Sequence, residues 1–191
     1  MRKSREAAAE SRRAIVETAA ALLRERGLGV GLTEIMAAVG MTHGGFYRHF
    51  ASKEALVAEA LEQALDEKAA TLAPQPGRPA REALRDYVAL YLSQAHLDHP
   101  EKGCPIAALG SEAARSPDSA RALAAGAEQL AACFAKDLGG DPIEARRQAV
   151  AMLAAMVGAV VIARAAGDSP LRGEMLDAVR ADPAFRALLD D

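Results

Sequence analysis

The chain has 191 residues, of which 51% are apolar, 4% are aromatic and none is tryptophan. This length suits one sizeable domain or a small domain joined to a larger one, and the Ala- and Leu-rich composition favours packed helices over a β-sandwich. The net charge of -3 excludes a uniformly basic protein, yet residues 1–53 carry nine Lys or Arg and five Glu, net +4. Only the N-terminal part therefore suits a polyanionic partner.

The sequence shows no sign of export or membrane insertion. No apolar run reaches the roughly 20 residues that span a bilayer, and the first residues lack a hydrophobic signal core. The two cysteines, Cys104 and Cys133, do not make the disulfide framework of a small secreted domain. We therefore expect a cytoplasmic protein with reduced thiols and no membrane partner.

Three helices are predicted in the N-terminal part. The first spans residues 6–26, where apolar residues recur at three- and four-residue spacing and Gly27 follows as a stop. Two short helices around a tight turn come next: Thr33 is expected to cap the first, Gly40 to end it and Thr42 to begin the second. This pattern is typical of a helix-turn-helix. The predicted core of this head consists of Ile15, Ala19, Leu22, Leu32, Ile35, Met36, Phe46 and Phe50.

The rest of the chain is predicted to form a larger helical body. Ser52 is expected to cap a helix that begins at Lys53 and continues toward Leu72, and the proline-rich residues 73–79 form a loop. Further helices are predicted at 82–97, 106–115, 117–138, 142–166 and 171–180, with an irregular link at 98–105 and a short turn at 183–189. The fold class is therefore all-α, with a head at residues 1–51 and a body at residues 52–191.

The segment from Gln148 to Ala163 contains no charged residue, which is typical of a helix buried on every side. One chain of this size can bury one face of that helix. A second subunit is the simplest cover for the other face, so the helices at 142–166 and 170–181 are predicted to pair in a homodimer as a four-helix bundle. A central core helix in a monomer is the alternative.

Four stretches of sequence occur in the order of a known signature. They are Leu32-Thr33-Glu34-Ile35, Ala37-Ala38-Val39-Gly40-Met41-Thr42, Phe46-Tyr47-Arg48-His49-Phe50 and Ser52-Lys53-Glu54-Ala55-Leu56. From residue 12 to about residue 60 the chain closely resembles the TetR family of transcriptional regulators. The resemblance implies a repressor that binds a palindromic double-stranded operator as a dimer and is released by a small-molecule effector. We expect no cofactor and no metal ion.

The resemblance also implies DNA-binding roles for individual residues. The predicted contacts are Thr33, Thr42, His43, Gly44, Tyr47, Arg48, His49 and Lys53. The first turn of the second short helix would face base edges, and the other residues would bind phosphates, with a guanine edge as the alternative for Arg48. Gly44 and Gly45 each cost about 1 kcal/mol relative to Ala in a helix. Close approach to DNA and a lack of room for a side chain are both open explanations.

An effector pocket is expected among the body helices. Its candidate residues are Tyr87, Tyr91, Cys104, Ile106, Leu109, Phe134, Met152 and Met156, and ordinary core packing is the expectation for more than half of them. Apolar lining with two tyrosine hydroxyls suits a hydrophobic or aromatic effector. The sequence does not identify the effector.

The segment from His96 to Cys104 suggests two other sites. Its residues His96, Asp98, His99 and Cys104 match no standard zinc spacing. Cys104 follows Lys102 and precedes a helix, so a redox- or electrophile-responsive regulator is an alternative, beside a buried structural cysteine.

An enzyme and a protein-binding dimer are the two classes of protein that contrast with a regulator. No Ser-His-Asp arrangement with motif support, Gly-rich phosphate loop or pair of carboxylates in a plausible cleft is recognised, so we expect no enzyme. A helical dimer that binds a partner protein, with the helix-turn-helix serving only as packing, is the remaining alternative. Substitution of Tyr47 and Lys53 separates it from a regulator, because only the regulator needs them for DNA binding.

Overall fold

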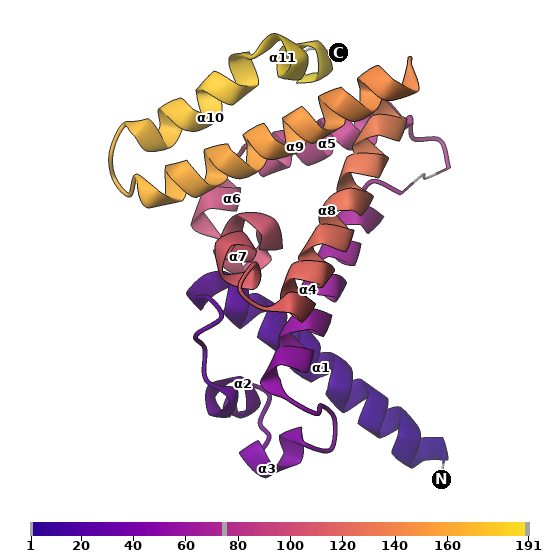
Figure 1. Cartoon of the computed structure of the whole chain (residues 1–191), viewed down its shortest axis with the longest axis vertical. Coiled ribbons are helices and arrows are strands. Elements are labelled where there is room, and N and C mark those ends of the chain that lie inside the picture. Colours follow the sequence, from indigo (N-terminus) through magenta and orange to yellow (C-terminus); the bar gives the residue numbers. More distant parts are fainter. Residues whose placement is uncertain (1, 74–75, 190–191) are drawn as a thin grey trace.

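The computed structural model describes residues 2–73 and 76–189, and every regular element in this part of the chain is helical (Figure 1). The elements are α1 (Arg2–Arg26), α2 (Leu32–Ala38), α3 (His43–Phe46), α4 (Lys53–Ala70), α5 (Ala80–Tyr91), α6 (Gln94–Asp98), the 3-10 turn η1 (Pro100–Lys102), α7 (Pro105–Ala113), α8 (Pro117–Leu138), α9 (Pro142–Ala165), α10 (Leu171–Ala181) and α11 (Pro183–Leu189). The all-α prediction is confirmed. Residues 74 and 75 of the predicted proline-rich loop lie outside the described residues.

The helix ends in the head follow the local chemistry of the chain. Gly40 has φ 69° and follows the end of α2, and the Ser52 Oγ atom accepts a hydrogen bond from the Ala55 N–H at 3.2 Å at the start of α4, both as predicted. The prediction that Thr33 caps α2 is wrong. The extended residue Gly31 stands at that position without a side-chain bond, and Thr33 lies inside the first turn of the helix.

The prediction of a single helix over residues 82–97 is also wrong, because α5 ends at Tyr91 and α6 begins at Gln94. Ser93 causes the break: its Oγ atom donates to the Leu90 carbonyl at 2.6 Å and accepts from the His96 N–H at 3.3 Å. A serine that bonds its own neighbouring backbone competes with helix continuation and then caps a new helix. The break between α5 and α6 places His96 against the ring of Tyr91, with 4.5 Å between the ring centroids.

The head consists of α1, α2 and α3 packed on the first turns of α4 (Figure 1). Six of the eight predicted core residues are buried, and Leu22 and Leu32 are half-buried. The same apolar cluster includes Leu109 and Ala113 of α7 and Ala122 of α8. The core of the head is therefore continuous with the body, and the boundary predicted near residue 51 falls inside packed structure.

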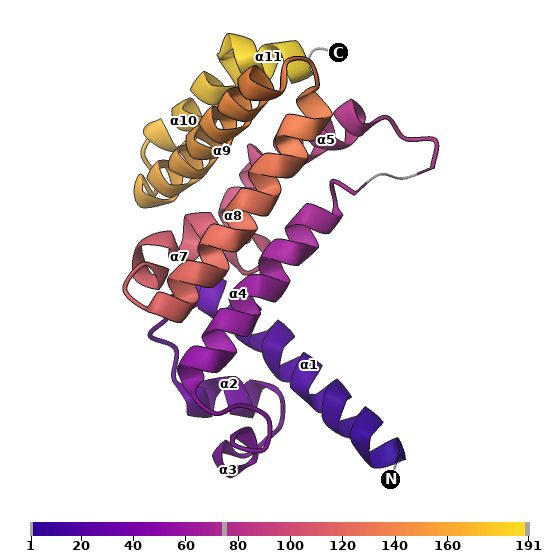
Figure 2. The same cartoon turned by 45° about the vertical axis from the view of Figure 1, so that its right-hand side comes forward.

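In the body, α8 lies beside α4, and α9, α10 and α11 form the end of the molecule opposite the head (Figures 1 and 2). The two long helices α4 and α8 lie close together at Gly126. A Cβ atom added there would lie 2.6 Å from the Cβ atom of Leu65. Only glycine therefore permits this separation of α4 and α8.

Helix α9 buries one face only. Met152, Met156 and Val160 are buried in the body core, whereas Ile143 is 82% exposed and Ile162 is 44% exposed. One chain therefore covers one face of this helix, as expected, and the covering of the other face by a second subunit stays a prediction. On length and composition α9 is also the one helix of the described residues that qualifies for crossing a membrane. A helix covered by protein on both faces has the same composition.

Substitution of Gly126 by alanine tests the approach of α4 and α8. Because the added Cβ atom overlaps Leu65, we expect Gly126→Ala to lower the free energy of unfolding by about 1–3 kcal/mol in urea denaturation. Gly110→Ala in α7 is the control, since its Cβ atom would meet only Ile106 at 4.0 Å. Equal stability of the two variants would contradict the close approach.

Candidate nucleic-acid interface and ligand cavity

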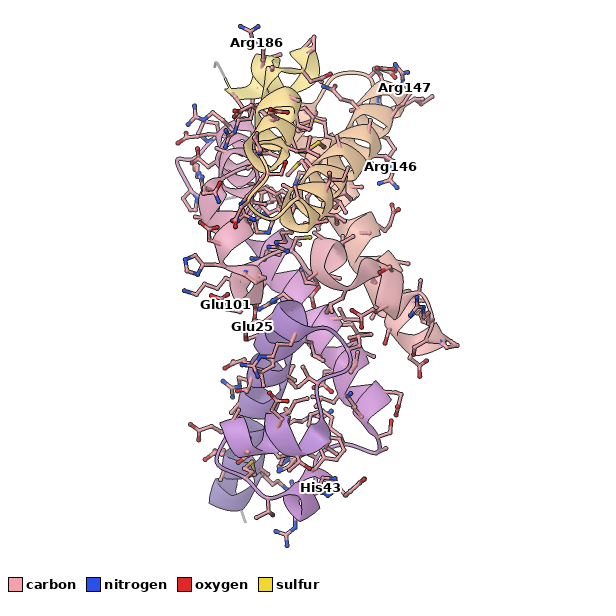
Figure 3. All side chains as sticks on the ribbon, turned by 90° about the vertical axis from the view of Figure 1, so that its left-hand side faces the viewer. Glu25, His43, Glu101, Arg146, Arg147 and Arg186 are labelled. Atoms are coloured by element: carbon pink, nitrogen blue, oxygen red, sulfur yellow. The ribbon has the colours of Figure 1, made fainter. Side chains whose placement is uncertain are left out.

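The helix α3 lies at one end of the molecule, where Figure 3 shows His43 at the tip of the head. Thr42, Gly44 and Arg48 are exposed there, and Tyr47 is 62% exposed. The Tyr47 ring meets the buried Phe46 ring and the His43 ring edge-on, with centroids 5.2 Å and 5.8 Å away. The ring is thus fixed while much of the side chain stays open to solvent. A phenol beside an imidazole and a guanidinium group suits contact with phosphates.

Arg12 holds the segment that follows α3, and the sequence analysis missed this residue. Its guanidinium group lies 4.1 Å from the centroid of the Phe50 ring and donates hydrogen bonds to the His49 carbonyl and to the Glu59 carboxylate. Arg12 therefore joins α1, the segment after α3 and α4. Its position on the polar face of an amphipathic helix gave no signal in the sequence.

Thr33 and Lys53, two predicted phosphate contacts, flank α3 along the chain. Thr33 is exposed in the first turn of α2. Lys53 is half-buried, and its Nζ atom donates to the Leu28 carbonyl at 2.7 Å. Lys53 thus holds the loop after α1 and keeps two further N–H groups for other acceptors.

The two glycines of α3 have space around them. A Cβ atom at Gly44 would meet nothing within 4 Å, and one at Gly45 would meet only the Thr42 Oγ1 atom at 3.6 Å. A lack of room inside the protein therefore does not explain these residues. The surface of α3 is flat where a bound macromolecule would approach the backbone.

A cavity of about 450 Å³ lies between the C-terminal part of α4, α5, α6 and η1. Its volume is within the range of about 300–1,000 Å³ typical of small-molecule sites. It is lined by Lys68, Thr71, Arg78, Ala83, Asp86, Tyr87, Leu90, Tyr91, Ala95, His96, His99, Lys102 and Cys104. The lining combines apolar and aromatic residues with four charged residues, called here the charged wall: Lys68, Arg78, Asp86 and Lys102.

Three of the eight predicted pocket residues, Tyr87, Tyr91 and Cys104, line this cavity. The other five contribute to packing: Phe134, Met152 and Met156 are buried in the body core, Ile106 packs against that core, and Leu109 belongs to the head cluster. The sequence analysis missed the charged wall, because its residues lie near helix ends and in loops. Only the fold brings these segments together.

His96 is a fixed neutral imidazole in the cavity wall. Its Nδ1 atom donates to the Tyr91 carbonyl at 2.7 Å, and its Nε2 atom accepts from the Cys104 N–H at 2.9 Å. Burial, with the charges of Arg164 and Lys68, lowers the pKa of His96 to about 4, against the opposing effect of the hydrogen bond to the Tyr91 carbonyl. With both ring nitrogens bonded, His96 has no free lone pair for a metal. Among the described residues no group of three His, Cys, Asp or Glu side chains is placed to hold one.

Two tyrosine hydroxyl groups in the cavity wall lack partners. The Oη atoms of Tyr87 and Tyr91 are buried without a hydrogen bond. Burial raises the pKa of both phenols well above the usual value, so both remain neutral donors. Cys104 is only 1% exposed, and it lines the cavity.

An exposed helix-turn-helix and a cavity inside a helical body define a DNA-binding regulator of transcription. Residues 15–60 match the family of bacterial regulatory proteins described as the tetR family, and residues 80–179 match the C-terminal domain of LmrA/YxaF-like transcriptional regulators. The chain therefore belongs to the TetR family of transcriptional regulators.

Solved structures support this assignment. The reduced form of Escherichia coli NemR is 25% identical, with a TM-score of 0.69 over 89% of this chain and 95% of that chain. A TetR transcriptional regulator from Chloroflexus aurantiacus is 26% identical, with a TM-score of 0.72 over 100% of this chain and 96% of that chain. No curated protein matches the sequence.

Gly44→Ala tests whether the flat surface of α3 serves DNA. Alanine has room at this position and is the better helix former, so we expect the variant to be up to about 1 kcal/mol more stable than the wild type. The added methyl group should nevertheless weaken operator binding about tenfold in a fluorescence anisotropy titration. Gly110→Ala is the control for DNA binding, and unchanged affinity of Gly44→Ala would contradict close approach.

His96→Gln tests the buried neutral imidazole. The folded pKa is about 4 and the ordinary value is 6.5, so the unfolded chain binds a proton first as the pH falls. The contribution of His96 to stability is therefore complete above pH 6.5 and is lost as the pH falls toward 4. The stability advantage of the wild type over the variant should shrink by about 3 kcal/mol between neutral pH and pH 4. Urea denaturation over this range measures it, and a constant difference would refute the assignment.

Proposed function

We propose that this regulator is a repressor that binds a palindromic operator as a homodimer and leaves the DNA when a small molecule occupies the cavity. The observation that carries the proposal is the direct connection between cavity and head. Helix α4 begins at Lys53, shortly after α3 in the chain, and its Lys68 lines the cavity. A displacement of one end of this helix would therefore also move the other end.

The turn η1 provides a second connection between cavity and head. The Arg24 Nε atom of α1 donates to the Glu101 carbonyl at 2.8 Å, and the Lys68 Nζ atom of α4 donates to the Lys102 carbonyl at 2.6 Å. Figure 3 shows Glu101 close to Glu25 at the junction of head and body. A ligand that binds one arrangement of this junction better than another shifts the population of head positions.

Eight residues form the proposed DNA-binding surface. They are Thr33, Thr42, His43, Gly44, Tyr47, Arg48, His49 and Lys53. The exposed first turn of α3 faces base edges, and the hydroxyl of Tyr47, the charge of Arg48 and the remaining N–H groups of Lys53 suit phosphates. The protein would act in the cytoplasm, where bacterial operator DNA lies, and it would act by binding without catalysis.

The outer face of α9 and α10 is the proposed dimer interface. The exposed apolar residues Ile143, Val150, Val161, Ile162 and Leu171 lie on α9 and at the start of α10. An apolar face of this kind is typical of a surface that a partner covers. A second copy related by a two-fold axis would place two α3 helices to read half-sites about 34–36 Å apart.

Selection of DNA sites from a random pool, repeated at two salt concentrations, tests the proposed function. We expect an enriched palindrome with half-sites about one helical turn apart. Tyr47→Phe should weaken binding to it about fivefold to tenfold, because one hydrogen bond to phosphate is lost. Asp118→Ala, at an exposed position of α8, is the control. Absence of any enriched sequence would overturn the proposal.

Ile162→Asp tests the dimer. A carboxylate on the apolar face of α9 should produce a monomer in light scattering, because its burial in an interface is unfavourable. Leu90→Asp is the matched control, since Leu90 is a 66% exposed apolar residue of α5. A wild type that is monomeric at micromolar concentration would contradict the interface.

A further inference from the structure

We propose that the cavity binds an amphipathic organic anion, with its headgroup at Lys68 and Lys102 and its apolar body against Tyr87 and Tyr91. That this anion is the effector rests on the proposed function. The binding site itself rests on the charges and the packing of the cavity wall.

Two lysines of the cavity lining have no carboxylate of the lining as a partner. Four residues with permanent charges line the cavity: Lys68, Arg78, Lys102 and Asp86. The Arg78 Nη2 atom lies 2.6 Å from the Asp86 Oδ2 atom, so these two charges neutralise each other. Neither lysine makes an ion pair with a carboxylate of the described residues. The lining therefore carries two net positive charges, and the nearby carboxylates of Glu67 and Glu101 lie outside it.

Lys68 is held in place in the lining. Its Nζ atom bonds the Lys102 carbonyl at 2.6 Å, which leaves two N–H groups for an incoming acceptor. Burial lowers the pKa of Lys68, and the nearby charge of Arg24 lowers it further, against a smaller opposing effect of Glu67. The protein thus keeps cations close together here, and an oxyanion would relieve their repulsion.

Much of the remaining lining is apolar or aromatic, and its rings are packed against neighbouring rings. The Tyr87 ring packs edge-on against Phe134 at 5.5 Å, and the Tyr91 ring packs against His96 at 4.5 Å. His96 is neutral at physiological pH and bonded at both nitrogens, and His99 lies 3.2 Å from the Glu101 carboxylate. Positive charge is therefore concentrated at the lysines. A ligand with one charged end and one apolar end matches this division.

The headgroup position also explains how occupancy would reach the DNA-binding surface. Lys68 ties α4 to η1, and η1 is tied to α1 through Arg24. An oxyanion that bonds the two remaining N–H groups of Lys68 would draw the ammonium group toward itself and weaken its bond to the Lys102 carbonyl. Occupancy would thereby loosen the contact between α4 and η1.

A pair of fluorophores with one skeleton tests the anion site. The first is the anion 8-anilinonaphthalene-1-sulfonate, and the second is the neutral N-phenyl-1-naphthylamine, which lacks the sulfonate. We expect the wild type to bind the anion at least tenfold more tightly. Lys68→Gln and Lys102→Gln should each weaken binding of the anion at least fivefold and change binding of the neutral compound less than twofold.

Lys136→Gln, at an exposed position of α8 away from the cavity, is the matched control. Lys102 is exposed, so its variant provides a test that does not depend on a buried contact. Equal affinity of the wild type for both fluorophores would overturn the anion site. So would an effect of the two cavity variants no larger than that of the control.

Displacement of the bound sulfonate distinguishes the headgroups. The competitors 2-naphthoate, 2-naphthyl phosphate and 2-naphthol share one apolar body and carry a carboxylate, a phosphate and a neutral hydroxyl. Stronger displacement by the carboxylate or by the phosphate than by 2-naphthol supports the proposal and identifies the class of anion. Displacement by 2-naphthol at the same concentration contradicts it.

The random-pool selection separates this inference from the proposed function. A chain that enriches no DNA sequence but binds the sulfonate through Lys68 retains the anion site and loses the repressor role. A chain that enriches a palindrome but binds both fluorophores equally retains the repressor role and loses the anion site.

Discussion

The turn η1 is held from two sides by half-buried cationic side chains, and the proposed connection between cavity and head depends on this. Arg24 of α1 bonds the Glu101 carbonyl, and Lys68 of α4 bonds the Lys102 carbonyl. Burial lowers the pKa of both cations, because each charge is less well solvated than it would be in water. A site that combines poor solvation of charge with the junction of two helices suits a switch, because a small change in charge there alters how the helices meet.

The packing of the head supports the same view. Its apolar cluster includes Leu109, Ala113 and Ala122 from α7 and α8, and the Glu112 carboxylate accepts a hydrogen bond from the Leu28 N–H at 3.0 Å. The head is therefore packed directly onto α7 and the start of α8. The cavity lies at the C-terminal end of α4. The first turns of this helix pack in the apolar cluster of the head, and its last turns pack in that of the body. The uncovered face of α9 would then set the distance between two such heads.

The sequence predicted most of the head because its signals are local. Gly40, Thr42 and Ser52 mark helix ends through their own backbone preferences, and Phe46 and Phe50 follow the apolar period. The break at Ser93 was missed because a serine within an apolar period is also compatible with a continuous helix. The charged wall was missed for a different reason. Lys68, Arg78 and Lys102 come from three separate segments, and nothing in their local sequence distinguishes them from solvent-facing residues.

The link between cavity and DNA is tested most directly by measuring the affinity for 8-anilinonaphthalene-1-sulfonate with and without a saturating amount of the selected operator. Binding free energies are reciprocal, so a ligand that releases the operator must bind more weakly when the operator is present. We expect the affinity to fall about fivefold or more on the operator, as typical coupling free energies imply. Equal affinity in both states would contradict the connection through α4 and η1.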